Sequence, residues 1–148
     1  MLTLCGTLLQ PRSADDCQVT RTGVVRVDQD GLIAEVGSVK TTAGDVVGDD
    51  SCWILPGFID AHLHVPQWDR RGIDGLSLAE WHHQVVYPAE ARMRDADLAA
   101  RLADELVSGL IACGTTTIAA FGSPFAEATD RTFEVFARRG LRAVFGMM

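Results

Sequence analysis

Helix-like and strand-like patterns of apolar residues alternate through the second half of the chain. Leucines recur at every fourth position from Leu98 to Leu110, which predicts a helix with one apolar face. Asp95 or Asp97 is expected to cap the beginning of this helix, and Gly114 is expected to end it.

Short, largely apolar runs on either side of this helix predict buried strands. The runs span residues 58–64, 115–121 and 141–147. A further helix is expected over residues 132–139, with Phe133, Phe136 and Ala137 facing inward and Gly140 at its end. Strands that alternate with helices at this spacing pair in parallel through right-handed crossovers, so the sequence predicts an α/β fold.

The first fifty residues instead predict strands joined by turns. Residues 2–10 form one expected strand, and residues 23–27 and 32–36 form a hairpin around Gly31. Farther along, a short helix over residues 76–86 is expected to stop before Pro88, because proline has no backbone N–H and crowds the preceding turn.

Composition narrows the class of protein. The 148 residues carry 20 acidic and 13 basic side chains, for a net charge of −7. No basic cluster is long enough to follow a phosphate backbone, which disfavours nucleic-acid binding. Four scattered cysteines, no signal-peptide pattern and no long apolar run lead us to expect a cytoplasmic enzyme without a membrane segment.

Two histidines end the first of the apolar runs. If residues 58–64 form a strand, side chains alternate between its faces, so Asp60, His62 and His64 share one face. The two imidazoles can then bind one ion with metal–nitrogen bonds of about 2.0–2.1 Å. Zinc is the favoured ion, and iron is possible for imidazole ligands. The alternative is a histidine pair on a solvated sheet face, but the intervening residues are apolar.

The sequence around the histidine pair resembles the amidohydrolase superfamily, which comprises metal-dependent hydrolases built on a (β/α)8 barrel. The run His62-Leu63-His64-Val65-Pro66-Gln67 is similar to the metal and substrate loop of the guanine deaminase family. Three later segments are similar to that family and to related deaminases of adenosine-type substrates: Leu78-Ala79-Glu80-Trp81, Tyr87-Pro88-Ala89-Glu90-Ala91-Arg92 and Cys113-Gly114-Thr115-Thr116-Thr117. The Pro66-Gln67 pair favours the guanine branch, whereas residues 68–77 match less well.

The resemblance implies a specific architecture. Residues 1–52 would be the N-terminal part of a small β-sandwich, and residues 53–148 the first three βα units of a TIM barrel. A complete barrel needs about 250 residues, so we expect this barrel to be incomplete and the chain to be the N-terminal portion of a longer enzyme. The remaining metal ligands and the residue that shuttles protons are expected beyond Met148, which leaves no catalytic residue within the chain.

Three side chains near the histidines are further candidates for the site. Gln67 offers a donor and an acceptor that match the mixed edge of a purine, or it is a solvated loop amide. Trp81 is expected to wall the pocket or to pack in the core, and Asp60 to orient a ligand histidine or to bond the backbone. The loop after Gln67 carries three residues that either cover the site or lie at the surface: Trp68, Arg70 and Arg71.

The implied activity is the metal-dependent hydrolytic deamination of guanine to xanthine and ammonia, by an enzyme that associates as a homo-oligomer. Metal-bound water has a pKa near 7 instead of about 15.7, which supplies hydroxide at neutral pH. One alternative is a sister aminohydrolase that acts on another purine, a pyrimidine or a triazine. A second alternative is that this chain is a non-catalytic fragment.

Overall fold

The computed structural model describes residues 1–38 and 44–148. The chain divides into two compact units, Met1–Pro56 and Gly57–Met148. None of the helices in the described residues combines the length and the hydropathy needed to cross a bilayer.

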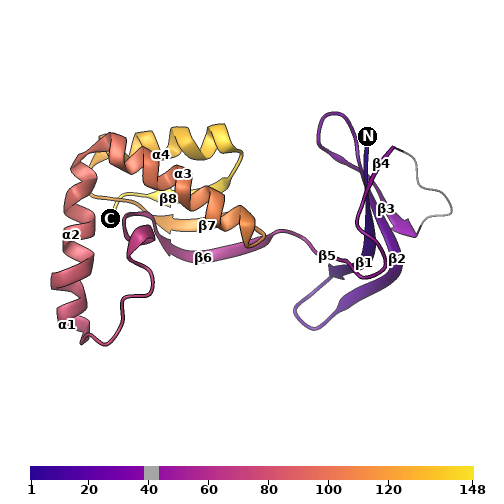
Figure 1. Ribbon diagram of the computed structural model, residues 1–148, viewed down its shortest axis with the longest axis horizontal. Helices are drawn as coiled ribbons and strands as arrows, with labels where there is room; N and C mark the ends of the chain where they lie inside the picture. Colours follow the sequence, from indigo (N-terminus) through magenta and orange to yellow (C-terminus); the bar gives the residue numbers. More distant parts are fainter. Residues whose placement is uncertain (39–43) are drawn as a thin grey trace. The chain divides into compact units, whose positions relative to one another are not determined.

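The described residues of the first unit form a five-stranded sheet (Figure 1). Its strands are β1 (Leu2–Pro11), β2 (Cys17–Val27), β3 (Ile33–Ser38), β4 (Asp45–Val47) and β5 (Trp53–Ile54). The order is β3-β2-β1-β4, and β5 also pairs with β1. The predicted hairpin joins the antiparallel strands β2 and β3, and Gly31 adopts the positive φ of 78° that its turn requires. A sandwich would need a second sheet, so that part of the expectation stays a prediction.

The second unit has three parallel strands in the order β6-β7-β8. They are β6 (Phe58–His64), β7 (Thr115–Phe121) and β8 (Arg142–Gly146). The main helices are α3 (Ala96–Ala112), which leads into β7, and α4 (Ala126–Arg139), which leads into β8 (Figure 1). Asp95 caps α3 by accepting a hydrogen bond from the Leu98 N–H at 3.0 Å, as the sequence predicts. The mixed α/β class is therefore confirmed.

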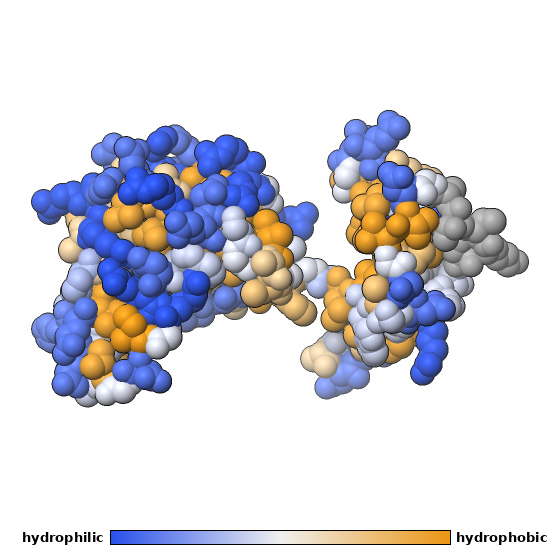
Figure 2. All heavy atoms as spheres, in the orientation of Figure 1, coloured by the Kyte–Doolittle hydropathy of each residue, from blue (hydrophilic) through white to orange (hydrophobic). Residues whose placement is uncertain are grey.

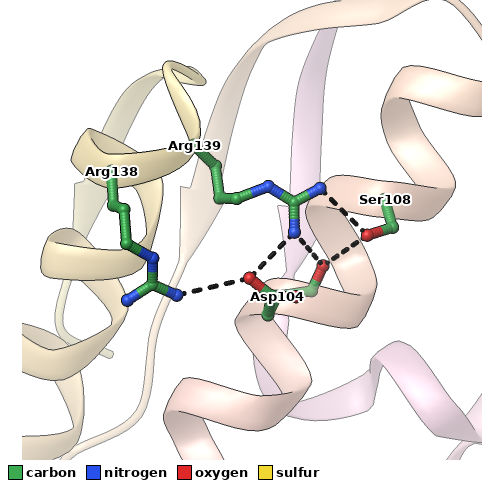
Figure 3. Close-up of polar contacts among 4 residues, drawn as sticks. All are labelled: Asp104, Ser108, Arg138 and Arg139. Atoms are coloured by element: carbon green, nitrogen blue, oxygen red, sulfur yellow. Dashed lines mark hydrogen bonds and ion pairs between the residues drawn. The ribbon is translucent and has the colours of Figure 1, made fainter.

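The helices α3 and α4 bury one side of this sheet. Leu106 and Val107 of α3, Phe136 of α4 and Ile118 of β7 are at most 2% exposed and form a single core cluster. At the surface the same two helices are joined by charge (Figure 3). The Asp104 carboxylate pairs with Arg139 at 2.8 Å and with Arg138 at 3.3 Å, and the Arg139 hydrogen bond lowers the pKa of Asp104.

The prediction that Pro88 ends the short helix is wrong. The chain stays helical through α1 (Leu78–Trp81), a π-helix (His82–Val86), α2 (Tyr87–Ala91) and a 3-10 turn (Arg92–Arg94). The N–H of Tyr87 donates to the carbonyl of His82, five residues back, so a new α segment begins at this position. Pro88 then lies in the first turn of α2, where the proline nitrogen needs no hydrogen-bond acceptor.

The inward face predicted for the last helix is only partly correct. Phe136 is buried, but Phe133 is 42% exposed and Ala137 is also exposed. The helix begins six residues earlier than predicted, so its buried side is set by a longer stripe. This stripe consists of Ala128, Thr129, Thr132, Val135 and Phe136. The two threonines are tolerated inside because their hydroxyls donate to backbone carbonyls one turn back.

Candidate metal centre

The two histidine rings at the end of β6 lie close together. The ring centroids of His62 and His64 are 5.1 Å apart, and the ring planes are inclined by 71°. Phe121, at the end of the neighbouring strand β7, lies 5.8 Å from the His62 ring and 5.1 Å from the His64 ring. The rings thus share one side of the sheet at the carboxyl ends of two parallel strands.

A β-bulge shapes this part of β6. Asp60 pairs with Ile118 and Leu63 pairs with Ala120, so β6 has one more residue than β7 between these pairs. The expected alternation is therefore broken. His62 and His64 still face each other, but the register places Asp60 beside Ile118, on the side that the helices cover. The prediction that all three share one face is thus wrong for Asp60.

Asp60 nevertheless acts on the next part of the strand. Its carboxylate accepts a hydrogen bond from the backbone N–H of His62 at 3.1 Å. Of the two alternatives left open by the sequence, the backbone bond is therefore the one formed. It restrains the main chain that carries the first histidine of the pair.

The electrostatics of His64 suit a metal ligand. Its Nδ1 is buried and has no hydrogen-bond partner. Burial lowers the pKa of His64, and the neighbouring His62 lowers it further. The ring is thereby kept in the neutral form that binds metal ions. In residues 1–38 and 44–148, no group of three or more His, Cys, Asp or Glu side chains is arranged to hold a metal, so the described residues place no third ligand of these types beside the pair.

A pocket of about 220 Å³ opens beside the histidine rings. Its walls come from the end of β6, from the 3-10 helix η1 (Val65–Arg70) and from α1. The lining residues are His62, Leu63, His64, Gln67, Trp68, Arg70, Arg71 and Trp81. The structure therefore gathers four predicted site residues, the two histidines, Gln67 and Trp81, at one cavity, while Asp60 does not line it.

The helix η1 is held in place by contacts with α3 and with two arginine side chains. The Trp68 ring packs onto Gly109 of α3, where a Cβ would lie 2.5 Å from the ring carbon Cζ2. Arg71 extends its guanidinium over the Trp68 ring, 3.1 Å from the centroid. Arg92 pairs with Asp69 and donates to the carbonyl of Pro66 at 3.2 Å. The pairing with Arg92 lowers the pKa of Asp69.

Sequence reasoning assigned no role of its own to Glu90. This side chain is only 7% exposed, and neither carboxylate oxygen has a hydrogen-bond partner of normal geometry. Burial raises the pKa of Glu90 to about 7, and the adjacent Gln67 amide opposes the shift. A usable signal was present, because Val86, Ala89 and Met93 place Glu90 on the buried side of a helix.

Comparisons with known proteins show the family of the chain. The model of the amidohydrolase family matches residues 53–148. A protein of Deinococcus radiodurans named "probable guanine deaminase" is 38% identical over 99% of this chain and 36% of its own length. A 5-methylthioadenosine/S-adenosylhomocysteine deaminase of Halobacterium salinarum is also 38% identical, over 84% of this chain and 29% of its own length.

A solved structure shows the same arrangement of the chain. The guanine deaminase of C. acetobutylicum, determined with guanine in its active site, superposes with a TM-score of 0.79 at 26% identity. The match covers 97% of this chain and 35% of that one. The chain thus spans about a third of the length of the relatives it matches. The match of the family model over residues 53–148, together with these likenesses, shows that this chain belongs to the amidohydrolase family.

Proposed function

We propose that this chain supplies the first metal-ligand pair and part of the substrate pocket of a (β/α)8 barrel enzyme that hydrolyses guanine to xanthine and ammonia. One observation carries the proposal. Two imidazoles, one with an unpartnered buried nitrogen, lie 5.1 Å apart beside a pocket that contains a glutamine amide. The 38% identity to the Deinococcus radiodurans protein and the likeness to the guanine-bound structure support guanine as the substrate.

His62 and His64 would hold a divalent metal ion. Zinc is favoured over iron because imidazole-rich hydrolytic sites commonly hold zinc. Once bound, the ion would supply the Lewis acidity that activates water at neutral pH. The other ligands, and the side chain that moves protons, would come from later barrel strands, since the described residues contain no third ligand near the pair.

The pocket residues would bind and orient the base. The Gln67 amide has a donor and an acceptor for the mixed hydrogen-bonding edge of a purine. Trp81 would form an apolar wall for the ring. Asp60, through its bond to the His62 N–H, would position the main chain that carries the first ligand.

In the proposed reaction, the oxygen of water replaces the exocyclic amino group of guanine. The oxygen of water bonds to the ring carbon that carries the exocyclic amino group, and the bond from that carbon to the amino nitrogen breaks. The two protons of water pass to the departing nitrogen and to the ring system, which yields ammonia and xanthine. Guanine is uncharged near neutral pH, so the net charge of −7 on this chain is no obstacle to its binding.

A second candidate is deamination of an adenosine-type substrate. The Halobacterium salinarum relative is as similar in identity as the first, and residues 68–77, which contribute to the pocket edge, depart from the guanine deaminase pattern. Both candidates share the histidine pair and differ in the group that Gln67 contacts. We place either activity in a cytoplasmic homo-oligomer.

Ammonia release from a panel of bases and nucleosides tests the proposal. The full-length enzyme, loaded with zinc, is incubated with guanine, adenine, cytosine, adenosine, 5-methylthioadenosine and a triazine. We expect guanine to give the highest kcat/KM, and Gln67→Ala to lower it by about tenfold, as for loss of one buried hydrogen bond. Deamination of another ring with guanine untouched would replace guanine as the substrate, and no turnover of any ring would refute the hydrolase.

A further inference from the structure

We propose that Glu90 is a positioning residue, which sets the orientation of the Gln67 side-chain amide and thereby decides which end of that amide faces the substrate. The inference rests on the function proposed above. Glu90 does not line the pocket, so it would affect substrate binding through Gln67.

The location of Glu90 is the first observation. Its helix, α2, packs against η1, the segment that carries Gln67. Glu90 lies between the buried residues Ala89 and Met93, which are 0% and 1% exposed. Burying a carboxyl group at such a position costs free energy unless another polar group forms a hydrogen bond with it. The adjacent polar group is the Gln67 amide, which interacts with the carboxylate.

The rigidity of the surrounding backbone is the second observation. Arg92, two residues after Glu90, donates to the Pro66 carbonyl and pairs with Asp69. These contacts restrain η1 on both sides of Gln67. The side-chain amide of Gln67 can still rotate between two orientations. Hydrogen bonding therefore decides which end of the Gln67 amide is turned toward the pocket and which toward Glu90.

The chemistry of an amide gives this choice a consequence. One end of Gln67 is an acceptor oxygen and the other is a double donor. Above a pH of about 7, where Glu90 is mostly ionised, its carboxylate attracts the NH2 end and turns the oxygen toward the pocket, where the oxygen accepts from an N–H of the base. Without Glu90, both orientations of the amide are populated, and part of the binding free energy is lost as ordering entropy.

The experiment compares three Glu90 variants of the full-length enzyme in two backgrounds. Glu90→Met keeps the volume and removes the hydrogen bond, whereas Glu90→Gln keeps both, and Glu90→Ala takes the place of the methionine variant if that one does not fold. Each variant is made in the parent and in Gln67→Ala. KM, kcat and the Kd of xanthine by calorimetry are measured. Glu105→Met, at an exposed site on α3, is the matched control.

We expect Glu90→Met to raise KM and the xanthine Kd about tenfold in the parent, with kcat within about twofold, because binding is lost uniformly. Glu90→Gln should raise KM by about threefold, less than Glu90→Met, because its amide still bonds Gln67 but can donate or accept and so selects one end of that amide less strongly. In Gln67→Ala, the change to methionine should have no further effect.

Three results would overturn the inference while leaving the proposed function intact. They are an unchanged KM in Glu90→Met, equal losses in both backgrounds, and a glutamine variant no better than the methionine variant. If the parent turns over no base at all, the proposed function has failed and this inference fails with it.

Discussion

Two buried polar groups near the pocket lack a hydrogen-bond partner of normal geometry. They are Nδ1 of His64 and the carboxylate of Glu90. An unsatisfied buried polar group costs about 1–3 kcal/mol, so folded proteins contain few of them. His64 lines the pocket and Glu90 interacts with Gln67, which also lines it, so ligand binding explains these two groups better than stability does.

Removal of one imidazole tests the role of the pair. We expect His64→Ala in the full-length enzyme to lower zinc affinity by more than about 100-fold. Loss of a residue that only hydrogen-bonds a metal ligand lowers affinity by up to about 100-fold, and loss of the ligand itself should cost more. Bound zinc per chain, measured by mass spectrometry after dialysis, should fall together with turnover. His83→Ala, at an exposed site on the π-helix, should retain its metal. Full zinc content in His64→Ala would show that His64 is not a ligand.

Glu90 should also make stability depend on pH. Its pKa is raised from 4.5 to about 7 in the folded state, so the folded protein binds a proton more tightly than the unfolded chain between these values. The free energy of unfolding therefore falls as the pH rises from about 5 to 7, by about 1–3 kcal/mol, and then levels off.

Urea unfolding of the parent and of Glu90→Gln at pH 5 and pH 8 measures this contribution. The variant carries no titrating carboxyl at this position. We expect it to gain stability relative to the parent at pH 8, with a smaller difference at pH 5. An identical difference at both pH values would mean that Glu90 titrates normally.

At the scale of elements, the site depends on where regular structure is interrupted. The bulge in β6 separates the face of Asp60 from that of the histidines. The π-helix before Tyr87 lets the chain continue through Pro88, so that Glu90 lies on a helix that packs against η1. Bulges and π-turns are common at functional sites because each redirects the side chains that follow it.

Gly109 shows how one element supports another. Alanine favours a helix over glycine by about 1 kcal/mol, yet a Cβ at this position would lie 2.5 Å from the Trp68 ring. We expect Gly109→Ala to give no gain in thermal stability and to raise KM several-fold, because the pocket wall at Trp68 must move. Glu105→Ala, on an exposed part of α3, should leave KM unchanged. A stabilised Gly109→Ala variant with normal KM would show that Trp68 adapts freely.

At the scale of the whole molecule, the open face of the second sheet exposes apolar side chains. Apolar residues appear at the surface of both units (Figure 2). In the sheet β6-β7-β8, Ile59 is 72% exposed, Phe121 43% and Val144 76%. Exposed apolar surface of this kind normally marks an interface. In the proposed barrel, later strands would cover it.

The isolated chain of residues 1–148 should therefore be inactive. We expect no ammonia release from guanine and weak zinc binding, since the described residues would offer the metal two histidines and no third ligand. The open sheet should also favour self-association, visible by size-exclusion chromatography at rising concentration. Calorimetry with zinc and an ammonia assay provide the measurements, and robust turnover by the pure chain would contradict the proposal.

Local patterns were sufficient to predict the order of the three strands and two main helices of the second unit, and the position of the histidine pair. As expected, the Leu98–Leu110 repeat lies in α3 and Asp95 caps its beginning. Gly114 follows the end of α3 with a φ of +82°. These features depend on residues within one or two turns of each other. For the same reason the strand ending in His62-Leu63-His64 could be placed to the residue.

Tertiary structure decided the rest of the site. The face of Asp60 depends on a register with β7, and the neighbours of Glu90 and Phe121 depend on segments more than twenty residues away. Register and packing between distant segments are set by the fit of whole surfaces, which no local pattern encodes. The sequence by itself therefore determined which side chains could bind a metal and a base, and the fold decided which of them meet.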